Sequence, residues 1–243
     1  MAGRITVILG GYGCGKTEFS LNLALRHAGE GKRVALVDLD IVNPFFRSGF
    51  HPGLLQQAGV RLIVSPYTLW ASDLPVVSPE VQAVFDGDFD EVIFDAGGDP
   101  VGATALGRYH PQFASARELE VLLLINARRP MCESEEEVVE LLGKLQAASR
   151  LCVTGLVNNT NLALETTPDL LREGDALLRA VSARTGLPVR CHGILAQLCE
   201  ACADMALAGE ALPITPYTRL GWLDWPPANG EEEGGGALCS PAL

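Results

Sequence analysis

The segment that most constrains this chain matches the pattern G-x-x-x-x-G-K-[ST] and reads Gly10-Gly11-Tyr12-Gly13-Cys14-Gly15-Lys16-Thr17. It follows an apolar run at residues 4–9, which is typical of a strand buried on both faces of a parallel sheet. A helical pattern then extends from Lys16 to Ala28 and ends at glycines. Glycines let consecutive backbone N–H groups face a phosphate, and the helix amino terminus adds partial positive charge. The segment therefore predicts a phosphate-binding loop.

Each part of this loop has an expected role. Lys16 is expected to bridge the β- and γ-phosphates and to act in catalysis, while the Thr17 hydroxyl ligates Mg²⁺. Cys14 has two interpretations, a redox-sensing thiol at a helix amino terminus or simply a small residue at a variable position, and we prefer the second. The nucleotide-binding residues predicted here are Gly11, Tyr12, Gly13, Cys14, Gly15, Lys16, Thr17 and Glu18.

The rest of the chain alternates strand and helix patterns. Strands are predicted at residues 33–37, 61–64, 91–94, 121–125, 151–157 and 188–191, and helices at 133–148 and 168–185. Such alternation predicts an α/β fold with a mostly parallel, twisted sheet flanked by helices on both faces, the three-layer sandwich of P-loop nucleoside triphosphatases. We expect one domain at residues 1–220 and an acidic, flexible tail at 221–243.

Two predicted strands end in carboxylates. Asp38 and Asp40 follow a buried strand and, being two residues apart, should point to the same side of the pleat. Asp95 ends another apolar strand and is followed by Gly97, which can bring a backbone N–H close to a γ-phosphate. Phosphoryl transfer needs a carboxylate near Mg²⁺ and a group that orients the attacking water. The alternative is an Asp that only caps a turn, which is less attractive beside an intact phosphate loop.

The order of these motifs resembles the MinD/ParA group of P-loop ATPases, which also contains CobQ/CobB-like domains. The resemblance rests on the phosphate loop and on VDLDIVNPFFRS, IFDAGGD and GLVNNTN, within residues 4–195. It implies ATP with Mg²⁺ as the ligand and two nucleotide-sensing switches at residues 43–48 and 97–103. It also implies that Asn159, or its neighbour Asn158, contacts the purine. The implied metal and catalytic residues are Thr17, Asp38, Asp40 and Asp95.

The chain departs from that group at one position. Most members carry a second lysine early in the loop, where this chain has Gly11. Because that lysine reaches the nucleotide of a second subunit, its absence weakens the expectation of a homodimer. Arg47 or Arg108, in the expected switches, could supply the charge, although ordinary surface arginines are the simpler interpretation.

Charge and composition exclude several classes of partner. The formal net charge is −12 and the densest charge run is acidic, so nucleic acid is not an expected partner. There is no apolar run long enough to span a bilayer and no basic amphipathic C-terminal helix, so we expect no membrane association. Seven irregularly spaced cysteines favour the reducing cytoplasm over a disulfide framework.

A late segment contains four potential soft metal ligands, Cys191, His192, Cys199 and Cys202. From residue 195 to 206, however, apolar residues and both of its cysteines recur at helical spacing, which predicts a helix with cysteines buried in its apolar stripe. We prefer structural cysteines to a metal site.

The main hypothesis is therefore an ATPase that acts as a nucleotide-dependent switch for a protein partner. Two alternatives stay open. The first is a CobB-like biosynthetic enzyme that activates a carboxylate with ATP, and the second is a metal-centre maturation ATPase using Cys199 and Cys202.

Overall fold

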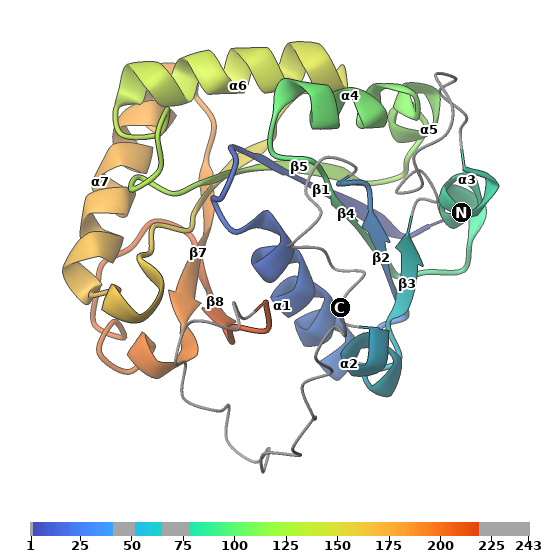
Figure 1. Ribbon diagram of the computed structural model, residues 1–243, viewed down its shortest axis with the longest axis horizontal. Coiled ribbons are helices and arrows are strands. Elements are labelled where there is room, and N and C mark those ends of the chain that lie inside the picture. The colour runs from blue at the N-terminus through green and yellow to red at the C-terminus, as the bar shows by residue number, and fades with distance from the viewer. Residues whose placement is uncertain (1, 41–51, 65–77, 219–243) are drawn as a thin grey trace, which may run out of the picture.

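The computed structural model describes residues 2–40, 52–64 and 78–218, which form one eight-stranded sheet with helices on both faces (Figure 1). The strand order is β3-β2-β4-β1-β5-β6-β7-β8, and every neighbouring pair is parallel. The strands are β1 Arg4–Gly10, β2 Val34–Asp38, β3 Arg61–Val64, β4 Glu91–Asp95, β5 Leu119–Ile125, β6 Gly155–Asn158, β7 Val189–Leu195 and β8 Glu210–Ile214. The helices are α1 Lys16–Gly29, α2 Pro52–Gln57, α3 Pro79–Asp86, α4 Pro100–Gly107, α5 His110–Ala114, α6 Glu135–Ser149 and α7 Pro168–Thr185, with short 3₁₀ turns at Ala163–Glu165 and Ala196–Leu198.

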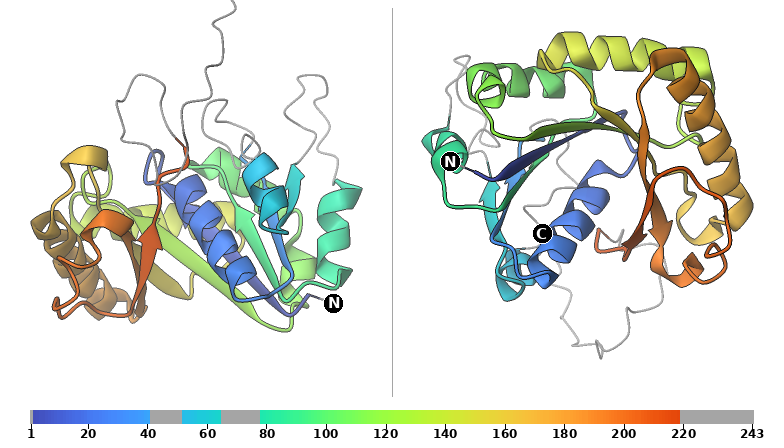
Figure 2. Two further views of the ribbon diagram at one scale, coloured as in Figure 1. Left: turned by 90° about the horizontal axis from the view of Figure 1, so that it is seen from below. Right: turned by 180° about the vertical axis from the view of Figure 1, so that it is seen from behind.

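Helices cover the two faces of the sheet unequally. Helix α1 packs on one face with α2, where Phe19 and Leu21 join a core with Ile8 and Leu36. Helices α3 to α7 lie on the other face, as the right-hand view of Figure 2 shows, and the core of that face is the larger of the two. Because both faces are covered, the central strands are apolar throughout rather than alternating. The predicted three-layer α/β sandwich is confirmed.

The last part of the described chain differs from the sequence prediction. No helix forms at residues 195–206: β7 continues to Leu195, a 3₁₀ turn follows at Ala196–Leu198, and turns lead to β8. The apolar stripe predicted there is only partly buried. Cys202 packs with Leu171 and Ile194 in a small separate cluster, whereas Cys199 is half-buried against it and Ala206 is exposed. Strand β8 was not predicted. It is an edge strand in which the burial pattern is broken and Pro213 is exposed.

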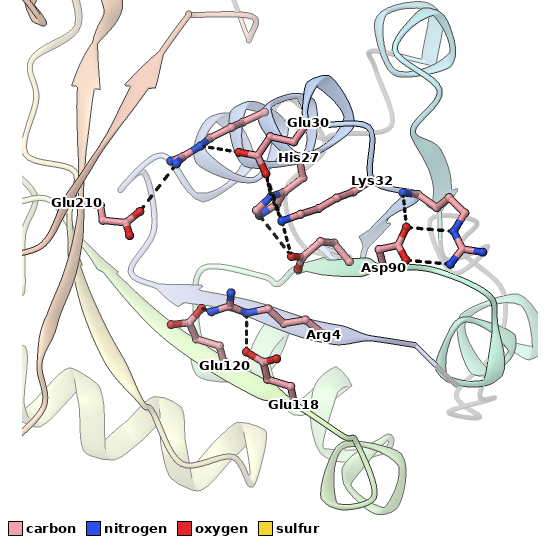
Figure 3. A network of polar contacts seen from close by, with 11 residues as sticks. Arg4, His27, Glu30, Lys32, Asp90, Glu118, Glu120 and Glu210 are labelled. Atoms are coloured by element: carbon pink, nitrogen blue, oxygen red, sulfur yellow. Dashed lines mark hydrogen bonds and ion pairs between the residues drawn. The ribbon is translucent and has the colours of Figure 1, made fainter.

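Salt bridges cover the edge of the sheet where the strands begin (Figure 3). Arg4 at the start of β1 pairs with Glu118 and Glu120, and Lys32 pairs with the buried Glu91 at 3.1 Å. Hydrogen bonding from His27 and then from Lys32 lowers the pKa of the Glu30 carboxyl to about 2. This edge is the opposite one from the phosphate loop, so these charges do not contribute to the nucleotide site.

Two expectations concern residues beyond the described ranges. The acidic tail predicted at 221–243 lies outside them, and so does the whole of the first expected switch, residues 43–48 with Arg47. Within the described ranges, no helix combines the length and the apolar composition needed to cross a bilayer.

Candidate functional site

The phosphate loop lies where the strand order reverses. From β1, the strands β4, β2 and β3 lie to one side and β5 to β8 to the other. All carboxyl ends point toward the same edge of the sheet, as the strand arrowheads in the left-hand view of Figure 2 show. In open parallel sheets, ligands bind at this edge, beside the reversal. The loop between β1 and α1 therefore stands at the position expected of a binding site.

The loop has the backbone geometry that its glycines predict. Gly13 and Gly15 have φ values of +71° and +90°, a left-handed region that side chains with a β-carbon rarely adopt. Gly15 is also the residue before α1, and its carbonyl accepts the Phe19 N–H at 2.9 Å. This arrangement opens the loop toward solvent and places the positive end of α1 directly behind it.

A cavity of about 410 Å³ opens beside the loop. One end is formed by Tyr12, Gly13, Lys16 and Thr17 of the loop, together with Asp40 and Gly98. The other end lies between the loops that follow β6, β7 and β8. That end is formed by Asn159, Thr160, Asn161, Ala163, Thr166, Thr167, Leu171, Gly193, Ile194, Leu195, Leu198, Cys202, Ile214, Pro216 and Thr218. The cavity therefore combines the phosphate loop and its polar groups with a compartment that several apolar side chains line, which is an arrangement that suits a nucleotide.

Lys16 points into the cradle. Its ammonium group donates to the Gly11 carbonyl at 3.0 Å, and the residue is 6% exposed. A β-carbon at Gly98 would lie 2.8 Å from this ammonium group and 3.0 Å from the Cα of Tyr12. A side chain at position 98 would therefore crowd both the Lys16 ammonium group and the backbone of the phosphate loop. The second expected switch, residues 97–103, thus begins in contact with Lys16.

The three predicted carboxylates take different places. Asp40 lines the cavity, whereas Asp38 and Asp95 are buried at adjoining ends of β2 and β4 and do not line it. The Asp40 N–H donates to Asp38 Oδ1 at 3.1 Å, so the two are held as a unit. Asp40 Oδ1 also lies 3.4 Å from where a β-carbon at Gly97 would be.

The oxygen donors at the cradle fit a magnesium ion. Mg²⁺ is usually held by one or two protein oxygens together with substrate phosphates, rather than by a complete protein cage. Thr17 and Asp40 offer a hydroxyl and a carboxylate in the cavity wall. Within the described part of the chain, no group of three or more His, Cys, Asp or Glu residues could hold a metal ion. The roles of Thr17, Asp38 and Asp95 as metal ligands stay predictions.

The two predicted purine contacts separate clearly. Asn159 lines the cavity, and its amide donates to the Cys14 carbonyl at 2.7 Å, which ties β6 to the phosphate loop. Asn158 is fully buried elsewhere. It bonds the Leu171 carbonyl, His192 Nδ1 and the Thr160 N–H at 3.0–3.1 Å. Of the pair, only Asn159 lines the cavity, and its contact with the base stays a prediction.

Glu18 holds the segment that closes the far side of the cavity. Its carboxylate accepts the backbone N–H groups of Tyr217 and Thr218 at 2.7 and 2.8 Å, and it also bonds the Thr218 hydroxyl. Asn22, one turn along α1, bonds both backbone groups of Thr215. Pro216 and Thr218 line the cavity. Glu18 thus lines the cavity and anchors the chain after β8, while its role in nucleotide binding stays a prediction.

The cysteines of the site are packed rather than reactive. Cys14 is fully buried, and that burial raises the pKa of its thiol despite the nearby Lys16 charge. Cys132, in the loop before α6, lies 3.8 Å from where a β-carbon at Gly11 would be, and burial raises its pKa to about 12. A protonated, enclosed thiol is a poor nucleophile, which favours the interpretation of Cys14 as a small packing residue.

The four late metal-ligand candidates do not act together. His192 is fully buried, with Nε2 bonded to the Ala208 carbonyl at 2.5 Å and Nδ1 to Asn158. Burial lowers its pKa, so the ring stays neutral. Cys199 and Cys202 belong to the apolar cluster around Leu171, and burial raises the pKa of each thiol.

Arg129 was not singled out from the sequence, yet it lines the cavity beside Gly13. It comes from the loop after β5, which carries no recognisable motif. Arg108, one of the two arginines that the sequence suggested, caps the carboxyl end of α4 and does not line the cavity. The only available signal for Arg129 was its position shortly after a predicted strand end.

The sheet topology and the loop geometry together define the fold of the P-loop nucleoside triphosphatases. Similar solved structures include FtsY from Thermotoga maritima, with 20% identity and a TM-score of 0.54, and FtsY from Mycoplasma mycoides, with 18% identity and a TM-score of 0.53. A third is the signal recognition particle 54 kDa protein from Aeropyrum pernix in complex with GDP, with 21% identity and a TM-score of 0.52.

The matched region covers 79%, 79% and 76% of this chain, but only 61%, 59% and 40% of those three proteins. At such identities the likeness shows the fold alone. Neither the protein-family models nor the curated proteins give a match. The narrower resemblance to the MinD/ParA group therefore stays a prediction.

Proposed function

We propose that this chain binds ATP with Mg²⁺ and hydrolyses it slowly, as a switch whose nucleotide state a protein partner reads. The observation that carries the proposal is the convergence of Lys16, Thr17 and Asp40 on one cradle at the amino terminus of α1. When bound, Mg²⁺ would be held by Thr17 and Asp40 in the cavity wall, with Asp38 and Asp95 buried behind them at the ends of β2 and β4, and it would neutralise charge on the phosphates. Asp40, in the cavity wall, is the residue best placed to orient the attacking water.

Adenine is the base that we propose for the end of the cavity away from the phosphate loop. Guanine presents adjacent N1–H and N2–H₂ donors, which a free carboxylate accepts well. Glu18 and Asp40 are the carboxylates among the described residues that line the cavity. Glu18 is engaged by Tyr217 and Thr218, and Asp40 lies at the phosphate end. The Asn161 side chain is also engaged within the protein, because its amide donates to the Asn159 carbonyl at 2.7 Å. GTP is the rival ligand, because one of the similar structures holds GDP.

The switch function rests on the contact between Gly98 and Lys16. A γ-phosphate bound beside Lys16 would meet the loop at residues 97–99 directly, so gain or loss of that phosphate would be felt at the start of α4. Four large apolar side chains are exposed in the loops around the cavity, namely Tyr12, Met131, Leu162 and Leu164. Such residues mark a protein–protein contact where they form one contiguous patch, which is the arrangement that we expect for a partner that docks over the nucleotide.

Phosphate release from Mg-ATP tests this function. Lys16→Ala should abolish hydrolysis, whereas Lys144→Ala, which removes an exposed lysine paired with Glu140 on α6, should leave it unchanged. Hydrogen exchange in residues 97–103 should slow with a non-hydrolysable ATP analogue relative to ADP. Equal exchange in both states would rule out a switch even if hydrolysis occurs. Phosphate release that requires a carboxylate metabolite would instead favour the biosynthetic alternative.

A further inference from the structure

The loop after β5 brings a second cation to the phosphate cradle. Nε, Cζ and Cδ of Arg129 lie 3.6, 3.7 and 3.8 Å from where a β-carbon at Gly13 would be. Gly13 stands in the middle of the phosphate loop, between Tyr12 and Cys14, and both it and Arg129 line the cavity. The guanidinium group therefore lies over the part of the loop whose backbone N–H groups are expected to surround the phosphates.

The backbone that carries Arg129 is fixed, while its side chain is available. The Arg129 N–H donates to the Asn126 carbonyl at 3.0 Å, and the Cys132 N–H donates to the Arg129 carbonyl at 3.1 Å. Asn126 is itself 1% exposed and bonds Asn161 across the cavity rim. In the described part of the chain, the Arg129 side chain has no hydrogen bond and no carboxylate partner, although the protein is strongly acidic.

The adjacent arginine behaves differently. Arg128 forms a salt bridge with Glu173 on α7 and does not line the cavity. Two neighbouring arginines thus point to different surroundings, one to a carboxylate and one to the phosphate loop. A guanidinium group recognises phosphate well, because its planar fork can donate two hydrogen bonds at once. Lys16 and Arg129 are the cations among the described residues that line the cavity.

We infer that Arg129 is a phosphate-binding residue of this site, which contacts the β- or γ-phosphate of the bound nucleotide from the same chain. The inference rests on the proposed function and adds a residue to it. It also gives the cradle a second positive charge without a contribution from another subunit. Because Gly13 is at the phosphate end of the cavity, Arg129 should not influence recognition of the base or the α-phosphate.

Calorimetric titration of the full chain with three ligands tests the assignment. Arg129→Ala should weaken binding of a non-hydrolysable ATP analogue by about tenfold or more, and Arg129→Lys by less. The same loss for ADP would assign the contact to the β-phosphate, and unchanged ADP binding would assign it to the γ-phosphate. Binding of AMP should not change. Arg128→Ala is the matched control and should bind all three ligands like the unaltered chain. The Arg129 side chain is exposed and forms no hydrogen bond in the described part of the chain, so we expect its variants to have the thermal stability of the unaltered chain. That result would show that folding is intact.

The outcomes separate this inference from the proposed function. If Lys16→Ala weakens binding but Arg129→Ala matches Arg128→Ala, the role of Arg129 is wrong and the nucleotide site stands. An equal loss for AMP and for the triphosphate analogue would also overturn it, since that would point to a general disturbance of the cavity. If the unaltered chain binds none of the ligands, both proposals fail.

Discussion

Replacing Glu18 with alanine should release the segment after β8 from α1. The Glu18 carboxylate accepts two backbone N–H groups, from Tyr217 and Thr218, and it also bonds the Thr218 hydroxyl. No other hydrogen bond to these two N–H groups is present in the described part of the chain. The second anchor, between Asn22 and Thr215, remains in the variant.

The size of the effect follows from these contacts. A hydrogen bond to a charged group contributes about 1.5 to 3 kcal/mol when it is well protected. Glu18, Tyr217 and Thr218 are all half-buried, so water can partly replace the lost partner. A net loss of about 2 kcal/mol for local opening is therefore reasonable, which corresponds to roughly thirtyfold faster exchange of the two amides. Because Pro216 and Thr218 line the cavity, affinity for Mg-ATP should also fall several-fold.

Hydrogen exchange read by mass spectrometry on a peptide covering residues 215–218 measures this opening directly. Glu30→Ala is the matched control, because Glu30 follows the same helix but pairs with Arg26 and Lys32 at the surface. The control should leave the peptide protected. Unchanged protection in Glu18→Ala, or equal loss in both variants, would refute the role assigned to Glu18.

Two further predictions concern packing around the phosphate loop. Gly98→Ala should weaken nucleotide binding about tenfold or more, because its β-carbon would displace the Lys16 ammonium group or the loop backbone. Gly143→Ala is the control and should bind normally, because a β-carbon there meets open space on α6. Equal affinities of the two variants in calorimetry would contradict the close approach of Gly98 to the phosphate loop. Burial raises the pKa of the Cys132 thiol to about 12 from an ordinary value near 9, so the unfolded chain binds fewer protons above pH 9. The free energy of unfolding in urea should therefore fall as pH rises from 9, and less so in Cys132→Val; an identical slope in both proteins would show that this thiol is not the cause.

The phosphate loop and the strands of the sheet were predictable because their information is contiguous in the sequence. The motif specifies a strand, a turn and a helix within a few residues, and the two faces of the sheet demand uninterrupted apolar runs. Strand boundaries were less predictable. The run at residues 151–157 is apolar from its start, but only Gly155–Asn158 forms β6. Before it, Leu151 and Val153 are buried while their N–H groups bond side chains instead of a neighbouring strand.

The features that the sequence did not predict depend on long-range contacts. The spacing of Leu198, Cys199 and Cys202 fits a helix, yet these residues lie in a 3₁₀ turn and the turns after it, where they pack in the cluster with Leu171. Strand β8 forms by pairing with β7, and its own residues carry no strand pattern that would predict it. Arg129 reaches the loop from a segment more than one hundred residues later in the chain, so only the topology places it beside Gly13.

The account depends on the cradle at residues 10–17 binding a nucleoside triphosphate. Calorimetric titration of the full chain with Mg-ATP and with Mg-GTP tests this most directly, with Lys16→Ala as the variant and Lys144→Ala as the control. The account predicts saturable binding of one ligand to one chain, tighter for ATP than for GTP, lost in Lys16→Ala and kept in Lys144→Ala. No saturable heat with either nucleotide, or unchanged binding in Lys16→Ala, would contradict it.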